Sequence, residues 1–211
     1  MKVLMTADTI GGVLTYACEL ITGLRERDAE VVLATFGRRP SVAQRRRLRA
    51  AGVTRVYESE LALEWMDEPW AELAQAQRWL LELERRERPD VIHLNGYGHA
   101  AAPWRAPVVV VAHSCVWSWW QAVHGTEPPL GWARYRAWVR AGLHAAAAVV
   151  APSRTMLAEL DRHYGRYATP RSVIHNASSV PPASATVVKR PVALAAGRFW
   201  DPAKNIALLA R

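Results

Sequence analysis

Short apolar runs alternate along this chain with longer amphipathic stretches. The runs are rich in valine and alanine and have the length of single β-strands. They lie at Lys2–Thr6, Glu30–Phe36, Val53–Glu58, Val91–Asn95, Val108–Ala112, Ala147–Ala151 and Ser172–His175. Strands that alternate with helices are typical of parallel strands joined by crossover helices. The pattern therefore predicts an α/β fold with a doubly wound, mostly parallel sheet.

The stretches between the runs have the 3.6-residue period of helices. Several apolar residues between Val13 and Leu24 share one face of a first predicted helix. Further helices are predicted after Ser41, after Pro69, over 132–146 and over 153–163. Three of them have a serine or a proline at the start, which is typical of helix N-termini. The tryptophan-rich segment that follows the fifth run is interpreted as a loop.

The chain changes character near residue 177. Residues 177–190 are mainly Ser, Ala, Pro and Val without periodicity, which is typical of a linker. Val192–Ala196 then has the composition of a new strand, and an amphipathic segment follows the turn at Asp201-Pro202. We therefore expect a first domain over residues 1–176, a linker over 177–190 and, over 191–211, the start of a truncated second domain.

The composition is that of a soluble globular protein, because 51% of the residues are hydrophobic and 22% are charged. The apolar runs are shorter than the roughly 18 residues that span a bilayer, and Asp8 ends the first run too early for a signal peptide. Two cysteines are too few for a disulfide scaffold and suit a reducing compartment. The sequence therefore predicts a cytoplasmic protein.

The net charge of +8 favours anionic partners such as phosphates, nucleic acid or an acidic membrane surface. The densest basic cluster, Arg45–Arg47 with Arg49, is interpreted as the solvated face of a surface helix. No nucleic-acid motif accompanies it, and the histidines and cysteines lack metal-ligand spacing. We expect no specific nucleic-acid partner, no metal and no cofactor, and a peripheral contact with the inner face of an anionic membrane stays open.

The loops after the strands are the first candidates for a site, because ligands bind beyond the carboxyl ends of the strands in an open parallel sheet. The first loop contains Asp8, Gly11 and Gly12. Two adjacent glycines at the start of a helix let backbone amides approach an anion, and a tight turn without a ligand is the alternative.

The fourth run ends at Asn95 and Gly96 in "NGYGHAA", which fits the dinucleotide-binding pattern. That pattern works after the first strand and with an acidic residue about 20 positions further on to hold a ribose. Neither condition is met here, so we do not interpret the segment as a nicotinamide or flavin site.

The fifth run leads into "VVVVAHSCVWSWW". A histidine at the end of a strand can hydrogen-bond a ligand or transfer a proton near neutral pH, so His113 is a candidate catalytic residue, with a structural role as the alternative. Trp117, Trp119 and Trp120 can stack on a sugar ring or a base, or pack in the core. We expect at least one of them at a ligand mouth or a domain interface.

Acidic residues gather ahead of the helix that follows Pro69. They are Glu58, Glu60, Glu64, Asp67 and Glu68. Two of them could form a carboxylate pair of the glycosidase type, but the segment is interpreted more simply as solvated.

Taken in order, these features resemble the family-4 glycosyltransferases of the GT-B fold. The matching stretches are "MKVLMTADTIGGVLTYACEL", "RPDVIHLNG", "VVVVAHS", "AVVAPSRTMLAELDRHYG", "SVIHNA" and "AAGRFWDPAKNIALLA". The resemblance spans nearly the whole chain. It implies two Rossmann-like domains that face a cleft, the first holding mainly the acceptor and the second the nucleotide-sugar donor.

The resemblance also implies roles for individual residues. Gly11 and Gly12 would lie near the donor phosphates, and His113 would contact the donor sugar in the catalytic centre. Arg198 and Lys204 would neutralise the donor diphosphate. Fixed cations and amides stabilise the negative charge that develops as a nucleoside diphosphate departs.

On the acceptor side, the candidates are Asp8, Asn95, Gly96, Trp117, Trp119 and Trp120, and the acceptor is a carbohydrate, a lipid or a small molecule. The chain departs from the family where Ala177, Ser178 and Ser179 follow "SVIHN", since a glycine and often an acidic residue are usual there. The family's paired glutamates, which bind the donor, would lie beyond Arg211.

The sequence thus predicts a retaining, metal-independent glycosyltransferase that moves a sugar from a nucleotide-sugar to an acceptor, with these 211 residues inactive by themselves. Two alternatives stay open. One is a non-catalytic Rossmann-like module that binds a phosphorylated ligand or a protein, and the other is a nucleotide-sugar epimerase of GT-B-like fold.

Overall fold

The computed structural model describes residues 1–179, 191–197, 199 and 201–210. Its centre is a seven-stranded sheet in the order β3-β2-β1-β4-β5-β6-β7, and all neighbouring strands pair in parallel. The strands are β1 (Lys2–Asp8), β2 (Glu30–Phe36), β3 (Arg55–Glu58), β4 (Val91–Leu94), β5 (Val108–Val111), β6 (Ala148–Ala151) and β7 (Arg171–Val173). The predicted α/β fold is confirmed, and each of the seven strands predicted before residue 177 is present with small changes at its ends.

Helices connect the strands, as the periodicity predicts. They are α1 (Val13–Arg25), α2 (Val42–Ala51), α3 (Trp70–Glu87), α4 (Val116–His124), α5 (Ala133–Ala145) and α6 (Arg154–Tyr164), with 3-10 turns η1 (Gly98–Ala101), η2 (Leu130–Trp132), η3 (Pro202–Lys204) and η4 (Ile206–Ala210). Ser41 and Ser153 accept hydrogen bonds from the backbone amides of Gln44 and Met156, so both serines cap their helices as predicted.

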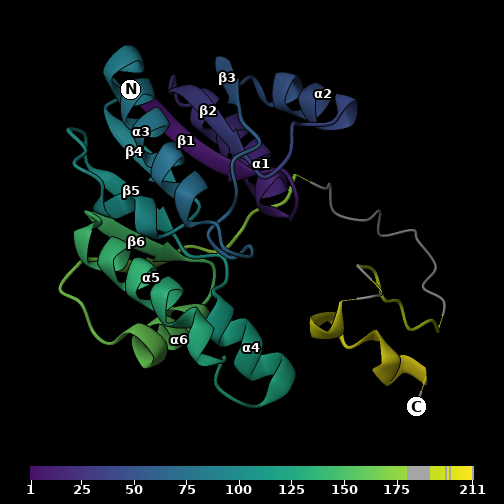
Figure 1. Cartoon of the computed structure of the whole chain (residues 1–211). Coiled ribbons are helices and arrows are strands. Elements are labelled where there is room, and N and C mark those ends of the chain that lie inside the picture. The colour runs from purple at the N-terminus through teal and green to yellow at the C-terminus, as the bar shows by residue number, and fades with distance from the viewer. Residues whose placement is uncertain (180–190, 198, 200, 211) are drawn as a thin grey trace.

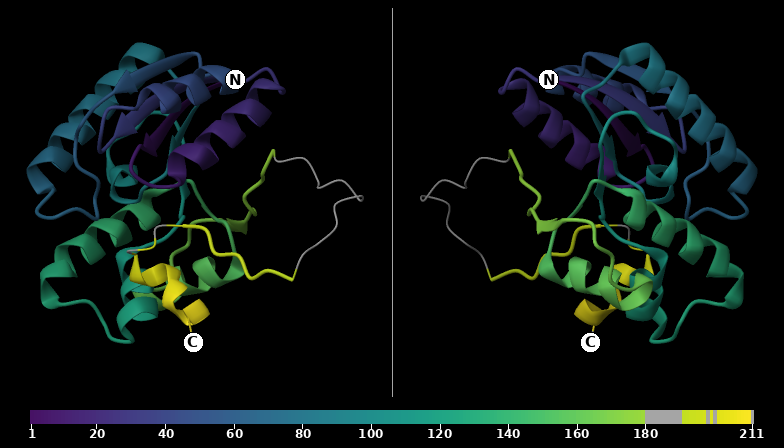
Figure 2. Two further views of the ribbon diagram at one scale, coloured as in Figure 1. Left: turned by 90° about the vertical axis from the view of Figure 1, so that its right-hand side faces the viewer. Right: turned by 90° about the vertical axis from the view of Figure 1, so that its left-hand side faces the viewer.

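The helices cover both faces of the sheet (Figures 1 and 2). Successive strand residues point to opposite faces. Val3 and Met5 therefore pack in a core cluster with α1 and α2, whereas Leu4 packs in a second cluster with α3, α5 and α6. This is the doubly wound arrangement that the alternating pattern predicts.

The direction of the chain reverses next to β1. From β1 the chain moves outward through β2 to β3, and it then returns along α3 to β4 on the other side of β1. At such a switch point the loops after neighbouring strands part to opposite faces and leave a crevice. The carboxyl ends of β1 and β4 are therefore where the topology leaves room for a ligand.

The segment after β5 was predicted as a loop, and this is wrong, because residues Val116–His124 form α4. The helix is capped by the sulfur of Cys115, which accepts a hydrogen bond from the amide of Ser118 at 3.3 Å. Cysteine is not among the usual capping residues, so the sequence carries no clear start signal at this point.

The predicted strand at Val192–Ala196 is not formed, and the described residues after it make the short turns η3 and η4 instead of a longer helix. A strand is stabilised by the ladder it shares with a neighbour. In the described part of the chain, no strand lies against this segment. The segment contacts the rest of the chain where η3 packs against α4.

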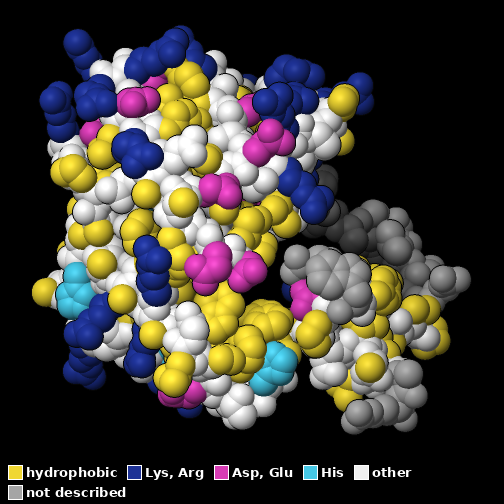
Figure 3. All heavy atoms as spheres, viewed as in Figure 1, with side chains coloured by type: hydrophobic (Ala, Val, Ile, Leu, Met, Phe, Trp, Pro, Cys, Tyr) yellow, Lys and Arg dark blue, Asp and Glu magenta, His cyan; other side chains and the backbone are white. Residues whose placement is uncertain are grey.

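Arginines of α2 lie on the surface, and Figure 3 shows Lys and Arg side chains gathered over this helix. Arg45 forms a two-point ion pair with Glu58, with nitrogen–oxygen distances of 2.7 and 2.6 Å. Arg47 donates to Thr15 of α1. The basic cluster is a helix face, as predicted. No helix in the described residues combines the length and the apolar character needed to span a membrane.

A buried carboxylate fastens β1 and β3 to α3. Glu87 is 6% exposed and accepts hydrogen bonds from Lys2, Arg55 and Tyr57. Burial by itself would raise the pKa of Glu87, but these three partners outweigh it and lower the pKa from 4.5 to about 2. The carboxylate therefore stabilises the fold above pH 4.5, and this contribution is lost as the pH falls toward 2.

Replacing Glu87→Gln should lower the free energy of unfolding at pH 7 by about 2–3 kcal/mol, because it leaves buried donors and cations without their carboxylate. Urea unfolding at pH 7 and pH 3 measures this, and the gap to the wild type should narrow at pH 3. Glu82→Gln, at an exposed position of the same helix, is the control. An equal loss in both variants would contradict the role of Glu87.

Candidate active site

A cavity of about 640 Å³ lies at the carboxyl edge of the sheet. Residues that follow β1, β4 and β5 line it, among them Asp8, Gly11, Gly12, Asn95 and His113. Because β1, β4 and β5 are neighbours in the sheet, residues far apart in the sequence meet here. The cavity therefore occupies the switch point. It brings together seven of the candidates that the sequence indicates, namely these five with Trp119 and Trp120.

Asn95 connects the ends of three strands. Its side-chain nitrogen donates to the carbonyl oxygen of Thr6 in β1 at 2.6 Å, and its backbone amide donates to the Thr6 hydroxyl at 3.0 Å. Its side-chain oxygen lies 2.8 Å from Nε2 of His113, beyond β5. Since the Asn95 nitrogen is used by Thr6, its oxygen must accept, and Nε2 of His113 therefore carries the proton.

His113 is held as a neutral ring. Burial lowers its pKa from 6.5 to about 4, so the imidazole carries no charge near pH 7. With the proton on Nε2, the other ring nitrogen, Nδ1, is a hydrogen-bond acceptor, and no side chain or backbone group in the described residues occupies it. The site thus offers one oriented, uncharged acceptor at the cavity wall.

Tyr16 of α1 contacts His113 and also stacks on His93 of β4. The ring of Tyr16 contacts that of His113 edge-on, with centroids 4.5 Å apart, and stacks at 6.3 Å on His93. His93 is buried, which lowers its pKa to about 4. Sequence reasoning missed both residues, although each lies on an element already predicted, because nothing in the local sequence marks a contact between β4 and α1.

The glycine loop after β1 is closed by its own carboxylate. Asp8 Oδ1 accepts hydrogen bonds from the amides of Ile10 at 2.9 Å and Gly11 at 2.6 Å. Gly12 is exposed and precedes α1 without a side-chain cap. The loop therefore has the tight-turn form, in which an anion at Gly11 would have to replace the carboxylate of Asp8, while the start of α1 stays accessible.

Glu64, which was expected in a solvated segment, is instead enclosed beside the cavity, and that expectation is wrong. Its carboxylate accepts hydrogen bonds from the amides of Tyr97 and Gly98 and from the indole nitrogen of Trp138, at 3.0 to 3.2 Å. Burial raises the pKa of Glu64, although these donors act against the shift. Glu64 fixes the segment after β4, and Tyr97 in turn donates to the carbonyl oxygen of Ser114, next to His113.

Two glycines let helix α5 approach this segment. A Cβ at Gly142 would overlap the carbonyl oxygen of Tyr97, and a Cβ at Gly98 would overlap the indole of Trp138. Both positions therefore require glycine because of close approach rather than backbone angle.

The three predicted tryptophans separate, because consecutive helix positions are rotated by about 100°. Trp119 and Trp120 line the cavity, together with Trp65 and Trp132, which were not predicted. Trp117 is 5% exposed, stacks on Tyr135 in the core and does not line the cavity.

Two further candidates, Gly96 and Lys204, are not among the residues that line this cavity. Gly96 lines a smaller hollow beside Glu64. Lys204 lies in η3, with its side chain near Gly197, and Arg198 is outside the described residues. Within those residues, no group of three or more His, Cys, Asp or Glu side chains is arranged to hold a metal ion.

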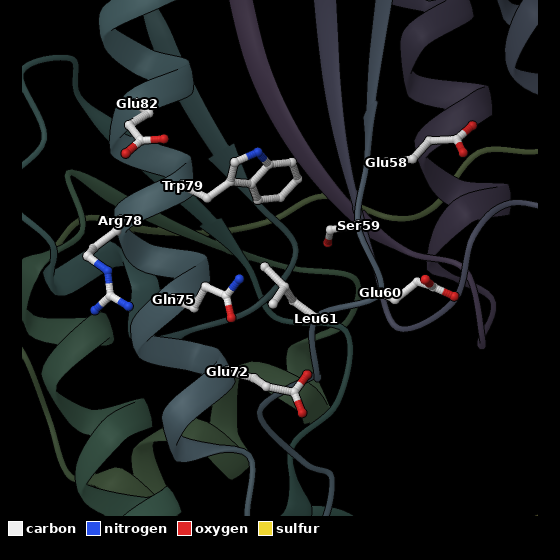
Figure 4. Close-up of a pocket in the computed structure, with 9 residues that line it drawn as sticks. All are labelled: Glu58, Ser59, Glu60, Leu61, Glu72, Gln75, Arg78, Trp79 and Glu82. Atoms are coloured by element: carbon white, nitrogen blue, oxygen red, sulfur yellow. The ribbon is translucent and has the colours of Figure 1, made fainter.

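A second hollow, of about 570 Å³, lies between α3 and the segment after β3 (Figure 4). Trp79 and Leu61 lie between the helix and this segment. Three of its four carboxylates are engaged: Glu58 pairs with Arg45, Glu60 with Arg39, and Glu72 accepts from the amide of Ala62. This hollow carries no feature of a catalytic site.

The comparisons with known proteins agree with the fold. Among solved structures, a glycosyltransferase from Rickettsia africae ESF-5 is 12% identical, with a TM-score of 0.57 over 82% of this chain and 42% of that one. Anabaena HepE, in complex with UDP and glucose, is 16% identical, with a TM-score of 0.54 over 83% and 44%. A UDP-N-acetylglucosamine 2-epimerase is 19% identical, with a TM-score of 0.56 over 83% and 48%.

These structures define the class as GT-B-like, with a Rossmann-like sheet, and the chain spans less than half of the length of each. No curated protein matches the sequence. Residues 10–178 match the family model described as Glycosyltransferase Family 4. The chain belongs to glycosyltransferase family 4.

Replacing Glu64→Gln should loosen the segment after β4, because an amide offers one acceptor oxygen where the carboxylate offers two. We expect a loss of about 1–3 kcal/mol in the free energy of unfolding and faster hydrogen exchange at the amides of Tyr97 and Gly98. Asp67→Asn, at an exposed position nearby, is the control. Unchanged exchange at both amides would refute the role of Glu64.

The His113 imidazole should titrate with a pKa of about 4, because burial disfavours its charged form. Proton NMR of the imidazole carbons between pH 3 and 8 measures this, and the signal lost in His113→Gln assigns the resonance. Since the unfolded chain keeps the ordinary pKa of 6.5, this group destabilises the fold as the pH falls from 6.5 to 4. A midpoint near 6.5 in the folded protein would show that the ring is solvated.

Proposed function

We propose that the chain is the acceptor-side part of a glycosyltransferase that moves a sugar from a nucleotide-sugar to an acceptor hydroxyl. The observation that carries this proposal is the neutral His113, fixed by Asn95 at the switch point with an uncommitted Nδ1. Membership in glycosyltransferase family 4 supports the reaction class.

In this proposal, Nδ1 of His113 accepts a hydrogen bond from a hydroxyl of the donor sugar and so fixes the position of its anomeric carbon. A positively charged imidazole could not do this, because Nδ1 would carry a proton. The lowered pKa keeps the ring competent over the neutral pH range.

The leaving diphosphate develops negative charge, which amides at the start of α1 and the cations Arg198 and Lys204 would stabilise. Anabaena HepE, which has a similar fold, was solved with UDP and glucose, and this supports a nucleotide-sugar donor. We further infer a retaining transfer without a metal ion, as the family resemblance implies.

We also propose that residues 1–176 form the acceptor-side domain, 177–190 a linker and 191–211 the beginning of a donor-binding domain. The chain spans 42% of the length of the Rickettsia glycosyltransferase. In this proposal, transfer requires groups of the second domain, so residues 1–211 by themselves bind the acceptor without transferring sugar.

A nucleotide-sugar epimerase is the second candidate, because a UDP-N-acetylglucosamine 2-epimerase has a similar fold. The likeness extends to the fold alone, whereas the family match favours transfer. Product analysis separates the two, since an epimerase releases an isomerised sugar without joining it to an acceptor.

In the complete gene product that contains these residues, His113→Ala should lower kcat/KM for transfer by about 100-fold or more, because it removes a fixed polar contact to the reacting sugar. Transfer from a panel of UDP-, GDP- and ADP-sugars provides the assay, and circular dichroism monitors the fold. His144→Ala, at an exposed position of α5, is the control. Full activity of the His113 variant would remove this residue from the mechanism.

A further inference from the structure

We propose that the acceptor is a hydroxyl compound with an apolar body rather than a free sugar. This inference rests on the proposed function and concerns the same cavity. It follows from a count of the polar groups that the cavity leaves available and from the side chains that make its other wall.

The wall formed by α4, η2 and the segment before α3 is mainly aromatic. Its side chains are Trp65, Trp119, Trp120 and Trp132, and we call them the aromatic wall. Hydrophobic side chains also gather where the body of the molecule faces the C-terminal segment (Figure 3). Burying such a surface under apolar groups makes the free energy of binding more favourable, and indole rings add specific stacking.

Three of the four tryptophans of the aromatic wall, Trp119, Trp120 and Trp132, have contacts with other aromatic rings. The rings of Trp119 and Trp120 lie 6.3 Å apart, and His124 contacts them at 5.7 and 4.5 Å. Trp132 packs edge-on against Tyr135, with centroids 5.7 Å apart. Ordered aromatic rings bind at a low entropy cost because little side-chain freedom is left to lose.

Most polar atoms of the cavity already have partners inside the protein. Both oxygens of Glu64 accept hydrogen bonds, and both side-chain groups of Asn95 are used. The Tyr97 hydroxyl donates to Ser114, and the Tyr135 hydroxyl accepts from the amide of Val116. These internal contacts reduce the number of hydrogen bonds that the same groups can offer to the hydroxyls of a sugar.

Among the described side chains at the ends of β1 and β5, the uncommitted polar atoms are Oδ2 of Asp8, Nδ1 of His113 and the hydroxyl of Ser114. The indole nitrogens of the aromatic wall can each donate one hydrogen bond but accept none, and the amides at the start of α1 are those proposed above for the donor phosphates. The set at the strand ends can orient one reacting hydroxyl and the donor sugar. The residues of the aromatic wall come from other elements, so the rest of the acceptor would contact indole rings.

The energetic balance favours an apolar body. Each sugar hydroxyl that is buried without a hydrogen-bond partner costs about 1–3 kcal/mol of binding free energy. An apolar group that covers the aromatic wall instead contributes favourably to the binding free energy. Trp65 and Trp119 are 46% and 38% exposed, so there is surface left to cover.

The test is calorimetric titration of the 211-residue chain with three probes. These are 2-naphthol, with a flat aromatic body, 1-octanol, with an aliphatic one, and methyl α-glucoside as the sugar. We expect 2-naphthol or 1-octanol to bind at least tenfold more tightly than methyl α-glucoside. Stronger binding of 2-naphthol indicates an aromatic acceptor, and stronger binding of 1-octanol indicates an aliphatic one.

Trp119→Ala and Trp120→Ala should weaken binding of the preferred probe by about tenfold, as expected for loss of a stacking indole. Leu130→Ala is the matched control, because Leu130 is 93% exposed, lies two residues before Trp132 and does not line the cavity. Trp119→Phe, which keeps an aromatic ring, should retain most of the binding. It is the control that separates loss of the stacking contact from loss of the fold.

The proposal is overturned if methyl α-glucoside binds as tightly as the apolar probes, or if both alanine variants bind them like the wild type. These titrations contain no donor, so they are independent of transfer. Probe binding without transfer by the complete gene product would refute the proposed function alone. Efficient transfer to carbohydrate acceptors would refute the apolar acceptor alone.

Discussion

Parallel pairing of β4 with both β1 and β5 is the constraint on which the candidate site depends. It brings three carboxyl ends to one edge, and the reversal beside β1 opens that edge to a ligand. Asn95 connects these strand ends, because its side chain donates a hydrogen bond to Thr6 and accepts one from His113. The tautomer of a single imidazole is therefore a consequence of strand order.

Features of the fold that depend on nearby residues could be predicted from the sequence. The strands follow from short apolar runs, and the starts of α2 and α6 follow from Ser41 and Ser153. Helix α4 could not be predicted in this way, because its cap is the sulfur of Cys115. The strand expected at Val192–Ala196 failed for a different reason, since a strand depends on a neighbour that no local pattern supplies.

The same distinction applies to the site. Positions at strand ends could be predicted from the sequence, and Asp8, Asn95 and His113 do lie together around one cavity. The role of Glu64 could not be predicted, because its partners lie 33 and 74 residues away in the sequence. The burial of Trp117 could not be predicted either, because the direction of one indole in a cluster depends on helix rotation, which is unknown for a segment interpreted as a loop.

The close approach of Gly142 to the carbonyl oxygen of Tyr97 connects the site to α5, a helix that no sequence motif assigns to the site. Tyr97 also donates a hydrogen bond to the carbonyl oxygen of Ser114, so it contacts both α5 and the cavity wall. A methyl group at position 142 would displace Tyr97. Tolerance to substitution along α5 should therefore be lowest at a residue without a side chain, and an inactive variant there would keep every catalytic group unchanged.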